Sequence, residues 1–355
     1  MRKPRLFSTL AAGLIAAISL NSHAAPKSDF SVCWTIYAGW MPWEYGAAEG
    51  IVDKWAKKYD INIDVVQIND YVESINQYSA GQFDGCTMTN MDALTIPAAG
   101  GVDSTALIIG DFSNGNDGVV LKGEKKTLGD LKGQNVNLVE LSVSHYLLAR
   151  GLEKAGLSEK DLKVVNTSDA DMVAAFSTSD VTAVTTWNPL LAEIEATPNV
   201  TKVFDSSQIP GEIIDLMVVN SDTLKDNPAF GKALTGAWYE IMATMSADTP
   251  AGKAAREHMA KASGTDLAGY EAQLAATKMF YSAKDAVAFA TSPKLPATMT
   301  KVAEFSFGHG LLGEGAQSAS AIGMSFAKGV VTGDKGNLKL RFDPSYMQMA
   351  ADGTL

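Results

Sequence analysis

The feature that most constrains the fold of this sequence is a repeated alternation of strand-like and helix-like segments. Residues 32–37 and 83–88 are mainly apolar runs of strand length, and residues 61–65 alternate apolar with polar side chains. Between them, apolar residues such as Ile51 and Trp55 recur at helical spacing. A chain of this pattern is expected to form parallel sheets with helices on both faces.

Two polar stretches interrupt this alternation, and after each one the pattern resumes. They lie at residues 111–115 and 206–211. A chain that leaves one α/β unit and later returns to it crosses between the units twice. We therefore predict an α/β fold of two lobes, with two parallel or mixed sheets joined by a two-crossing hinge and a helical C-terminal part. Lobe 1 is expected to contain residues 25–112 and 216–355, lobe 2 residues 113–215, and the ligand cleft should lie between them.

The N-terminus has the pattern of a secretory signal over residues 1–24. Arg2, Lys3 and Arg5 precede a short apolar stretch, and Ala24 supplies a small residue for cleavage. The apolar stretch is shorter than a typical membrane span, and no cysteine follows it directly to carry a lipid. These features predict an exported protein that is free in the periplasm.

The charge balance argues against two classes of partner. The chain has a formal net charge of −11, and cleavage of the signal would remove three basic residues and make it more acidic. An acidic protein is a poor binder of nucleic acid or of an anionic membrane. We therefore expect no nucleic-acid partner, and a cationic or neutral solute suits the chain better.

Two cysteines, Cys33 and Cys86, lie inside predicted strands, each four residues before the loop that follows. If these strands are neighbours, the thiols could lie level with each other, and export would permit a disulfide. Sequence does not supply the geometry that a disulfide needs. We expect two buried free thiols.

Loops at the carboxyl ends of the strands are the expected place for a ligand. They supply aromatic faces, carboxylates, hydroxyls and amides, but no Lys or Arg. Aromatic faces with carboxylates suit a delocalised cation through cation–π contact and charge-assisted hydrogen bonds. The candidate ligand-binding residues are Tyr37, Trp43, Glu44, Asn90, Asp92, Glu140, Ser142, Ser144, Trp187 and Asp215.

Structural roles remain open for several of these candidates. Asp92 precedes an apolar helix and could simply cap it, while Glu44 and Glu140 could favour a helix macrodipole. Tryptophans often pack in cores. Ser142 and His145 fall within one helical turn without a third partner, so we predict no catalytic pair, no metal site and no cofactor.

Several short motifs, taken in order along the chain, resemble the periplasmic substrate-binding proteins of the nitrate/sulfonate/taurine ABC importer group. They are Gly39-x-x-Pro42-Trp43, Glu49-Gly50, Gly81-x-x-Asp84, Ser142-x-Ser144-His145-Tyr146-Leu147-Leu148 and Trp187-x-Pro189. This resemblance implies a two-domain hinged α/β fold, a monomer, and a permease with its ATPase as partners.

One departure from that group concerns the ligand. The group usually has a glycine before the Ser-x-x-His segment, whereas this chain has Leu141 preceded by Glu140. Together with residues 40–46, the pattern resembles the branch associated with urea carboxylase or guanidine carboxylase operons. That resemblance implies urea or guanidinium as ligand, and the residue chemistry favours guanidinium. The alternatives are urea or another small polar or cationic nutrient, a nitrate- or sulfonate-type anion, and an enzyme like the pyrimidine-synthesis relatives of this fold.

Overall fold

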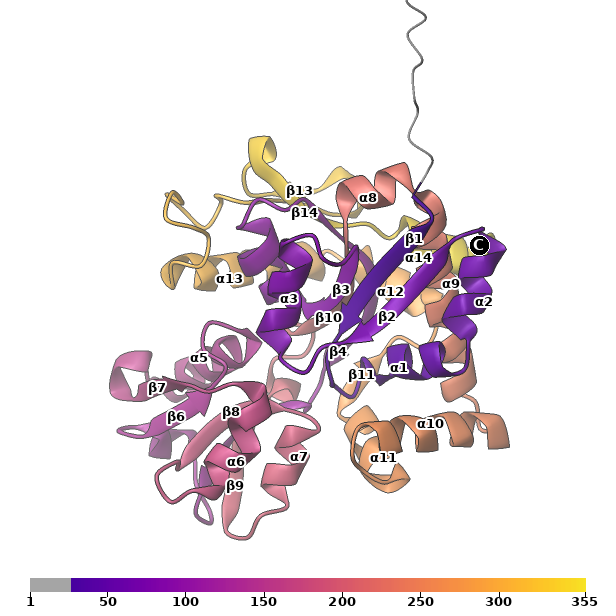
Figure 1. Cartoon of the computed structure of the whole chain (residues 1–355). Helices are drawn as coiled ribbons and strands as arrows, with labels where there is room; N and C mark the ends of the chain where they lie inside the picture. Colours follow the sequence, from indigo (N-terminus) through magenta and orange to yellow (C-terminus); the bar gives the residue numbers. More distant parts are fainter. Residues whose placement is uncertain (1–26) are drawn as a thin grey trace, which may run out of the picture.

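Two mixed β-sheets form the centres of two lobes in the computed structural model, which describes residues 27–355 (Figure 1). The predicted signal at residues 1–24 lies outside the described residues. Among the helices that are described, none combines the length and apolar character needed to cross a membrane. The predicted fold class, a two-lobed α/β protein with mixed sheets, is confirmed.

The larger sheet belongs to the lobe that contains both described ends of the chain, here called lobe 1. Strands β1 and β2 are parallel, as are β1 and β3, whereas β10 runs antiparallel to both of its neighbours. In spatial order the strands are β13 (Val331–Thr332), β12 (Gly323–Ser325), β14 (Leu338–Phe342), β4 (Ser104–Ser113), β10 (Ile214–Asn220), β3 (Gly85–Thr89), β1 (Asp29–Trp34) and β2 (Asn62–Gln67), and β11 (Thr277–Met279) pairs with β4.

Helices surround this sheet and extend the lobe below it in Figure 1, where α10 and α11 lie beside lobe 2. They are α1 (Met41–Ala48), α2 (Ile51–Lys58), α3 (Tyr71–Ser79), α4 (Asn90–Ala93), α8 (Ser221–Asp226), α9 (Pro228–Met245), α10 (Pro250–Ala262), α11 (Leu267–Ala275), α12 (Ala283–Ala290), α13 (Lys294–Gly308) and α14 (Ser345–Asp352).

The smaller sheet forms lobe 2, with β5 antiparallel to both of its neighbours. Its strands in spatial order are β7 (Lys163–Asn166), β6 (Asn135–Leu138), β8 (Ala183–Trp187), β5 (Asp117–Lys122) and β9 (Val200–Asp205). Helices α5 (Val143–Ala155), α6 (Met172–Ser177) and α7 (Leu190–Glu195) pack around it.

The chain passes between the lobes twice, from β4 to β5 and from β9 to β10. The hydroxyls of Ser113 and Ser206, one from each crossing, lie 2.6 Å apart. The backbone N–H of Gly115 also donates to the Ser206 hydroxyl at 2.7 Å. These bonds hold the two crossings side by side, as a hinge requires.

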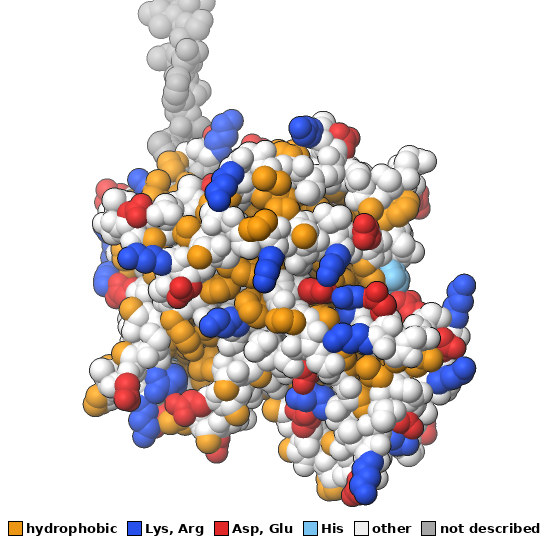
Figure 2. All heavy atoms as spheres, turned by 180° about the vertical axis from the view of Figure 1, so that it is seen from behind, with side chains coloured by type: hydrophobic (Ala, Val, Ile, Leu, Met, Phe, Trp, Pro, Cys, Tyr) orange, Lys and Arg blue, Asp and Glu red, His pale blue; other side chains and the backbone are white. Residues whose placement is uncertain are grey.

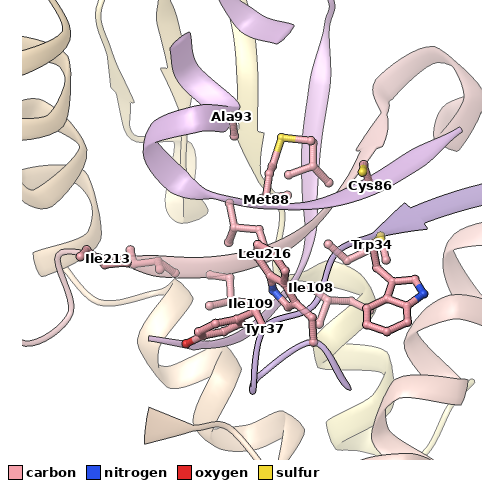
Figure 3. Packing of buried hydrophobic residues seen from close by; sticks show 14 of the residues in the cluster. Trp34, Tyr37, Cys86, Met88, Ala93, Ile108, Ile109, Ile213 and Leu216 are labelled. Carbon is pink, nitrogen blue, oxygen red and sulfur yellow. The ribbon is translucent and has the colours of Figure 1, made fainter. Parts of the chain in front are cut away.

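The core of lobe 1 lies against its three central strands. Figure 3 shows Met88, Ile108 and Leu216 converging from β3, β4 and β10, and all three are essentially inaccessible to solvent. Strands buried on both faces read as continuous apolar runs, which is why 104–109 and 214–219 carry few polar side chains. Tyr37 lies at the edge of this cluster with its hydroxyl directed away from it.

Some local expectations differ from the structure. The apolar pattern that continues from Pro42 to Tyr59 is divided into α1 and α2, because Gly50 adopts a left-handed backbone (φ 68°) between them. Within the C-terminal part, expected to be helical, residues 338–342 form the strand β14 ahead of α14. Strand β14 pairs with β4, and its Leu340 and Phe342 are buried. This long-range pairing leaves no local pattern in the sequence.

The expectation of two free thiols was wrong, because Cys33 and Cys86 form a disulfide. The two residues are register partners on the parallel strands β1 and β3, with Cα atoms 4.4 Å apart. Parallel neighbours at one level direct their side chains to the same face of the sheet, which brings the sulfurs together.

Candidate ligand-binding site

A small cavity lies between the lobes, at the end of the sheets nearest the hinge. Only about 10 Å³ of it is open to the centre of a water-sized sphere, about the room of one water molecule, so a larger ligand requires the walls to move apart. Both lobes contribute to its wall, so a ligand held there contacts both. Lobe 1 supplies Tyr37, Trp40, Tyr71, Thr89, Ile213 and Asp215, and lobe 2 supplies Asp117, Val143 and Trp187.

Strand register brings the polar lining residues together. Thr89 at the end of β3 lies opposite Asp215 at the start of β10. In lobe 2, Asp117 at the start of β5 lies opposite Trp187 at the end of β8. Tyr37 follows the end of β1. The cavity therefore lies at the carboxyl ends of the parallel strands β1, β3 and β8, where open α/β sheets place ligands.

Four aromatic rings form a continuous chain across the cavity. The centroid of Trp40 lies 5.1 Å from that of Tyr37 and 5.7 Å from that of Tyr71. Tyr71 in turn meets Trp187 of lobe 2 edge-on at 5.5 Å. Such rings offer flat apolar faces with negative electrostatic potential, which suit a planar or cationic ligand.

Two carboxylates line the cavity and two more lie directly behind it. Asp111, behind the wall, is the register partner of the lining residue Asp215, and its Oδ1 accepts a hydrogen bond from the Tyr37 hydroxyl at 3.2 Å. The backbone N–H of Asp117 donates to the hydroxyl of Ser113 at 3.2 Å. These contacts hold Asp111 beside Tyr37 and Asp215, and they tie Asp117 to the first crossing.

Asp92 is the fourth carboxylate of this group, at the start of the helical segment after β3. Its Oδ2 accepts hydrogen bonds from the Tyr71 hydroxyl at 2.7 Å and the Thr89 hydroxyl at 2.8 Å. The same Thr89 hydroxyl caps α4. Asp92 thus positions two residues that line the cavity.

The four carboxylates are buried, and within the described chain none of them forms a salt bridge. The Oδ2 atoms of Asp111 and Asp215 and the Oδ1 atom of Asp92 also have no hydrogen-bond partner there. Buried charges in proteins are normally paired, because an unpaired one loses its hydration without compensation.

Burial changes the protonation of these carboxylates. It raises the pKa of Asp92 to about 6 and the pKa of Asp111 and of Asp117 to about 7. The pKa of Asp215 is raised well above its usual range by burial and by the neighbouring charges of Asp111 and Asp117. A cation held between them would favour their ionised forms.

No basic side chain balances these acids at the cavity wall. Among the described residues that line it, none is Lys, Arg or His. A groove outside the cavity continues this character, since Asp169 and Glu193 line it and no Lys or Arg does so in the described chain. The groove lies between lobe 2 and α11. Figure 2, which shows the molecule from behind, has a notch in the surface there.

Four of the candidate residues named from sequence belong to this site. Tyr37, Trp187 and Asp215 line the cavity, and Asp92 supports it.

Three other candidates hold the segments around the site. The Asn90 side chain donates to the Glu212 carbonyl at 3.1 Å and accepts from the Ile214 N–H at 3.0 Å, which braces the strand that carries Asp215. Ser142 caps α5 by accepting from the Ser144 N–H at 3.2 Å. Ser144 is buried, and its hydroxyl has no hydrogen-bond partner within the described residues. Neither serine lines the cavity.

The remaining three candidates lie away from the cavity. Trp43 is 1% exposed and packs against Trp238 in the core of lobe 1, with ring centroids 5.1 Å apart. Glu44 pairs with His258 of α10 at 2.9 Å. Glu140 is exposed to solvent. All three residues follow a strand end in sequence. Trp43 and Glu44 lie in α1, whose geometry directs their side chains away from the cavity, and the loop that carries Glu140 exposes it to solvent.

Sequence reasoning missed Asp111, Asp117 and Tyr71. Asp111 lies in β4 shortly before the first crossing, and Asp215 lies in β10 directly after the second, so the pairing of β4 with β10 was the signal that could have identified Asp111. Asp117 begins β5 opposite Trp187, which was a candidate. Tyr71 begins a helix after a loop, and no local pattern marks it.

The second crossing also carries the main polar contact between the lobes near the hinge. Glu212 accepts hydrogen bonds from the Tyr146 hydroxyl at 2.7 Å and from Arg150 Nε at 2.9 Å, both on α5 of lobe 2. Lys301 of α13 in lobe 1 donates to the same carboxylate at 3.1 Å. Glu212 thus connects both lobes immediately before the cavity residues Ile213 and Asp215.

Solved structures that share this architecture include a sulfonate-binding protein and a nitrate-binding protein. The alkanesulfonate-binding protein of Xanthomonas axonopodis pv. citri, bound to MOPS, has a TM-score of 0.66 at 17% identity, covering 82% of this chain and 96% of that one. The nitrate-binding protein of Synechocystis PCC 6803 has a TM-score of 0.56 at 12% identity, covering 93% and 100%. At these identities the likeness shows the fold alone.

Curated relatives match over shorter segments. A Brucella abortus protein whose name describes it as a binding protein is 31% identical over 103 residues, or 29% of this chain. An Escherichia coli protein named for binding aliphatic sulfonates is 42% identical over 64 residues, or 18% of this chain. The matches span 31% and 20% of the length of these two relatives.

A family model described as "NMT1/THI5 like" matches residues 55–248, which is more than half of the chain. The matched range contains all of lobe 2, both crossings and the cavity residues other than Tyr37 and Trp40. This chain therefore belongs to the NMT1/THI5-like family.

Proposed function

We propose that this protein is the solute-binding component of an ABC importer and that it captures guanidinium by closing its two lobes around it. The observation that carries this proposal is the set of buried carboxylates without a cationic partner in the described chain, at a cavity walled by aromatic rings. The motifs shared with importer-associated binding proteins support the transport role. The periplasmic location rests on the predicted signal.

The chemistry of the wall matches guanidinium in charge, shape and donors. Guanidinium is planar, carries a delocalised charge and presents only N–H donors. Asp215 of lobe 1 and Asp117 of lobe 2 would accept those donors, and the rings of Trp40 and Trp187 would contact its faces. Because the two carboxylates come from different lobes, the ligand would stabilise the closed arrangement relative to the open one.

Two other ligands fit the wall less well. Neutral urea would leave the carboxylates without a counter-charge, and its carbonyl oxygen would need a donor. An anion of sulfonate or nitrate type, as the names of some similar proteins suggest, would be repelled by the carboxylates.

Calorimetric titration of the purified protein tests the ligand directly. We expect heat of binding with guanidinium chloride, a weaker response with urea, and none with nitrate, taurine or ethanesulfonate, each compared with sodium chloride at matched ionic strength. Binding of an anion, with no response to guanidinium, would overturn the cation assignment.

Matched variants test which carboxylates take part. Asp215→Asn and Asp117→Asn each remove one charge-assisted hydrogen bond without changing side-chain size. Such a loss should weaken guanidinium binding by roughly 10- to 100-fold. Glu140→Gln removes one carboxylate of the exposed loop and serves as the control, with unchanged affinity expected. Equal losses in all three variants would point to long-range charge and not to contact.

A further inference from the structure

A second polar contact joins the lobes away from the cavity. His145 on α5 and Glu159, which follows that helix, belong to lobe 2, whereas His309 at the end of α13 belongs to lobe 1. In Figure 1, α13 lies directly above α5. The Glu159 Oε1 atom is 2.8 Å from Nε2 of His309 and 3.3 Å from Nε2 of His145.

Packing around Phe305 holds His145 and His309 close to each other. The ring of Phe305, one turn before His309, lies 4.0 Å from the His309 ring, centroid to centroid. It also meets Tyr146 edge-on at 5.2 Å and His145 at 6.0 Å. The contact between α5 and α13 therefore has a hydrophobic centre, with Glu212 on one polar side and Glu159 on the other.

The hydrogen bonds of the imidazoles indicate where the protons lie. Nδ1 of His309 lies 2.8 Å from the Phe305 carbonyl oxygen, which can only accept, so Nδ1 carries a proton. Nε2 of the same ring faces the Glu159 carboxylate, which also only accepts when ionised. A positive centre is required between them, and a proton on Nε2 would make His309 an imidazolium.

The tautomer of His145 indicates whether a proton or a metal ion lies between these side chains. Its Nδ1 accepts a hydrogen bond from the Leu141 N–H at 3.1 Å, so in the neutral ring the proton is on Nε2, the atom that faces Glu159. A protonated Nε2 cannot coordinate a metal ion. The three side chains are close enough to be considered as metal ligands, but this tautomer argues against coordination through His145, whose Nε2 contacts Glu159 at 3.3 Å without a hydrogen bond.

We propose that His145, Glu159 and His309 form an ionised clasp that stabilises the closed arrangement of the lobes from outside the ligand cavity. Any motion of lobe 2 that parts α5 from α13 breaks the Glu159–His309 ion pair while the Glu159–His145 contact remains within lobe 2. The clasp should therefore slow the opening of the lobes and the release of the ligand. Its kinetic test rests on the proposed function.

The chain offers a matched control for this clasp. His258 and Glu44 form another histidine–carboxylate pair at 2.9 Å, but both belong to lobe 1. His309→Gln and His258→Gln each remove one such pair, and only the first pair spans the lobes. Glu159→Gln removes the carboxylate of the Glu159–His309 pair, which lobe 2 supplies.

Release of guanidinium, followed by tryptophan fluorescence in stopped flow, gives the kinetic readout. We expect His309→Gln and Glu159→Gln to release the ligand about 1.5- to 5-fold faster than the unchanged chain, the range of exposed ion pairs. His258→Gln should release it at the original rate. Equal rates in all four proteins would overturn the clasp.

A spectroscopic readout does not depend on the ligand. In long-range nitrogen–proton spectra at neutral pH, His309 should show protons on both ring nitrogens, and Glu159→Gln should remove the one on Nε2. If the purified protein instead holds a stoichiometric transition metal that Glu159→Gln releases, the site is a metal centre and the clasp is wrong. If no guanidinium binds but these spectra agree, the clasp stands and the proposed ligand fails.

Discussion

The individual aspartates at the cavity have environments that predict how binding depends on pH. Burial raises the pKa of Asp92 to about 6 and of Asp117 to about 7. Guanidinium keeps its charge throughout this range. Bound between the lobes it favours the ionised carboxylates, so binding must release any proton that they hold.

Guanidinium affinity should therefore increase as the pH rises from about 5 to about 8. Titration calorimetry in two buffers of different ionisation enthalpy would measure both the affinity and the protons released. Asp117→Asn should reduce the number of protons released near neutral pH. An affinity that is flat over this range would show that the carboxylates are already ionised before the ligand arrives.

Single residues also show where sequence reasoning succeeds and where it stops. Tyr37, Trp187 and Asp215 were identifiable because a strand end fixes their position at the carboxyl edge of a sheet. Trp43 and Glu44 lie only a few residues beyond the same edge, but they are in α1. There one turn of helix decides whether a side chain faces the cavity or the core. That rotation is set by packing against α9 and α10, which sequence does not show.

Among the elements, the pairing of β1 with β3 places a covalent link beneath the site. The Cys33–Cys86 disulfide closes a chain segment with a sequence separation of 53 residues. Such a link reduces the freedom of the unfolded chain, by roughly 2–4 kcal/mol in typical cases. Both cysteines are fully buried, so their replacement by a small apolar residue also removes some packing.

The double variant Cys33→Ala/Cys86→Ala should lose at least roughly 2 kcal/mol in the free energy of unfolding measured with urea. Its guanidinium affinity should change little, because neither cysteine lines the cavity. The unchanged chain under reducing conditions separates the effect of the bond from that of packing. Equal stability with and without reductant would mean that the bond contributes nothing.

At the level of elements, periodicity predicted most strands and helices, and the exceptions share one cause. The short strands β11 and β14 complete the large sheet by pairing with β4, which lies far away in the sequence. Their own residues carry too few alternations to be read locally. The pairing of β4 with β10 makes Asp111 and Asp215 neighbours. This pairing is also long-range, so the sequence did not reveal Asp111 as a residue of the site.

For the whole molecule, closure brings like charges together. Asp117 of lobe 2 faces Asp215, Asp111 and Asp92 of lobe 1 across the cavity. Their pKa values are raised in this closed arrangement, so protonation favours closure. The stabilisation is fully present below the ordinary pKa of an aspartate and is lost as the pH rises through about 6 to 7. At about pH 8 the ligand-free protein should therefore be open for more of the time than at about pH 5.

Solution scattering can measure this opening as a change in the radius of gyration. The unchanged protein should contract when guanidinium is added at about pH 8, and also without ligand when the pH is lowered to about 5. Asp117→Asn removes the only charge that lobe 2 presents to the cavity among the described residues. It should be more compact at about pH 8 without ligand, and contract less on adding it. If Asp117→Asn is as extended as the unchanged protein, the repulsion does not control opening. The hinge contacts of Glu212 would then set the resting position, because they join the same two lobes independently of the cavity charges.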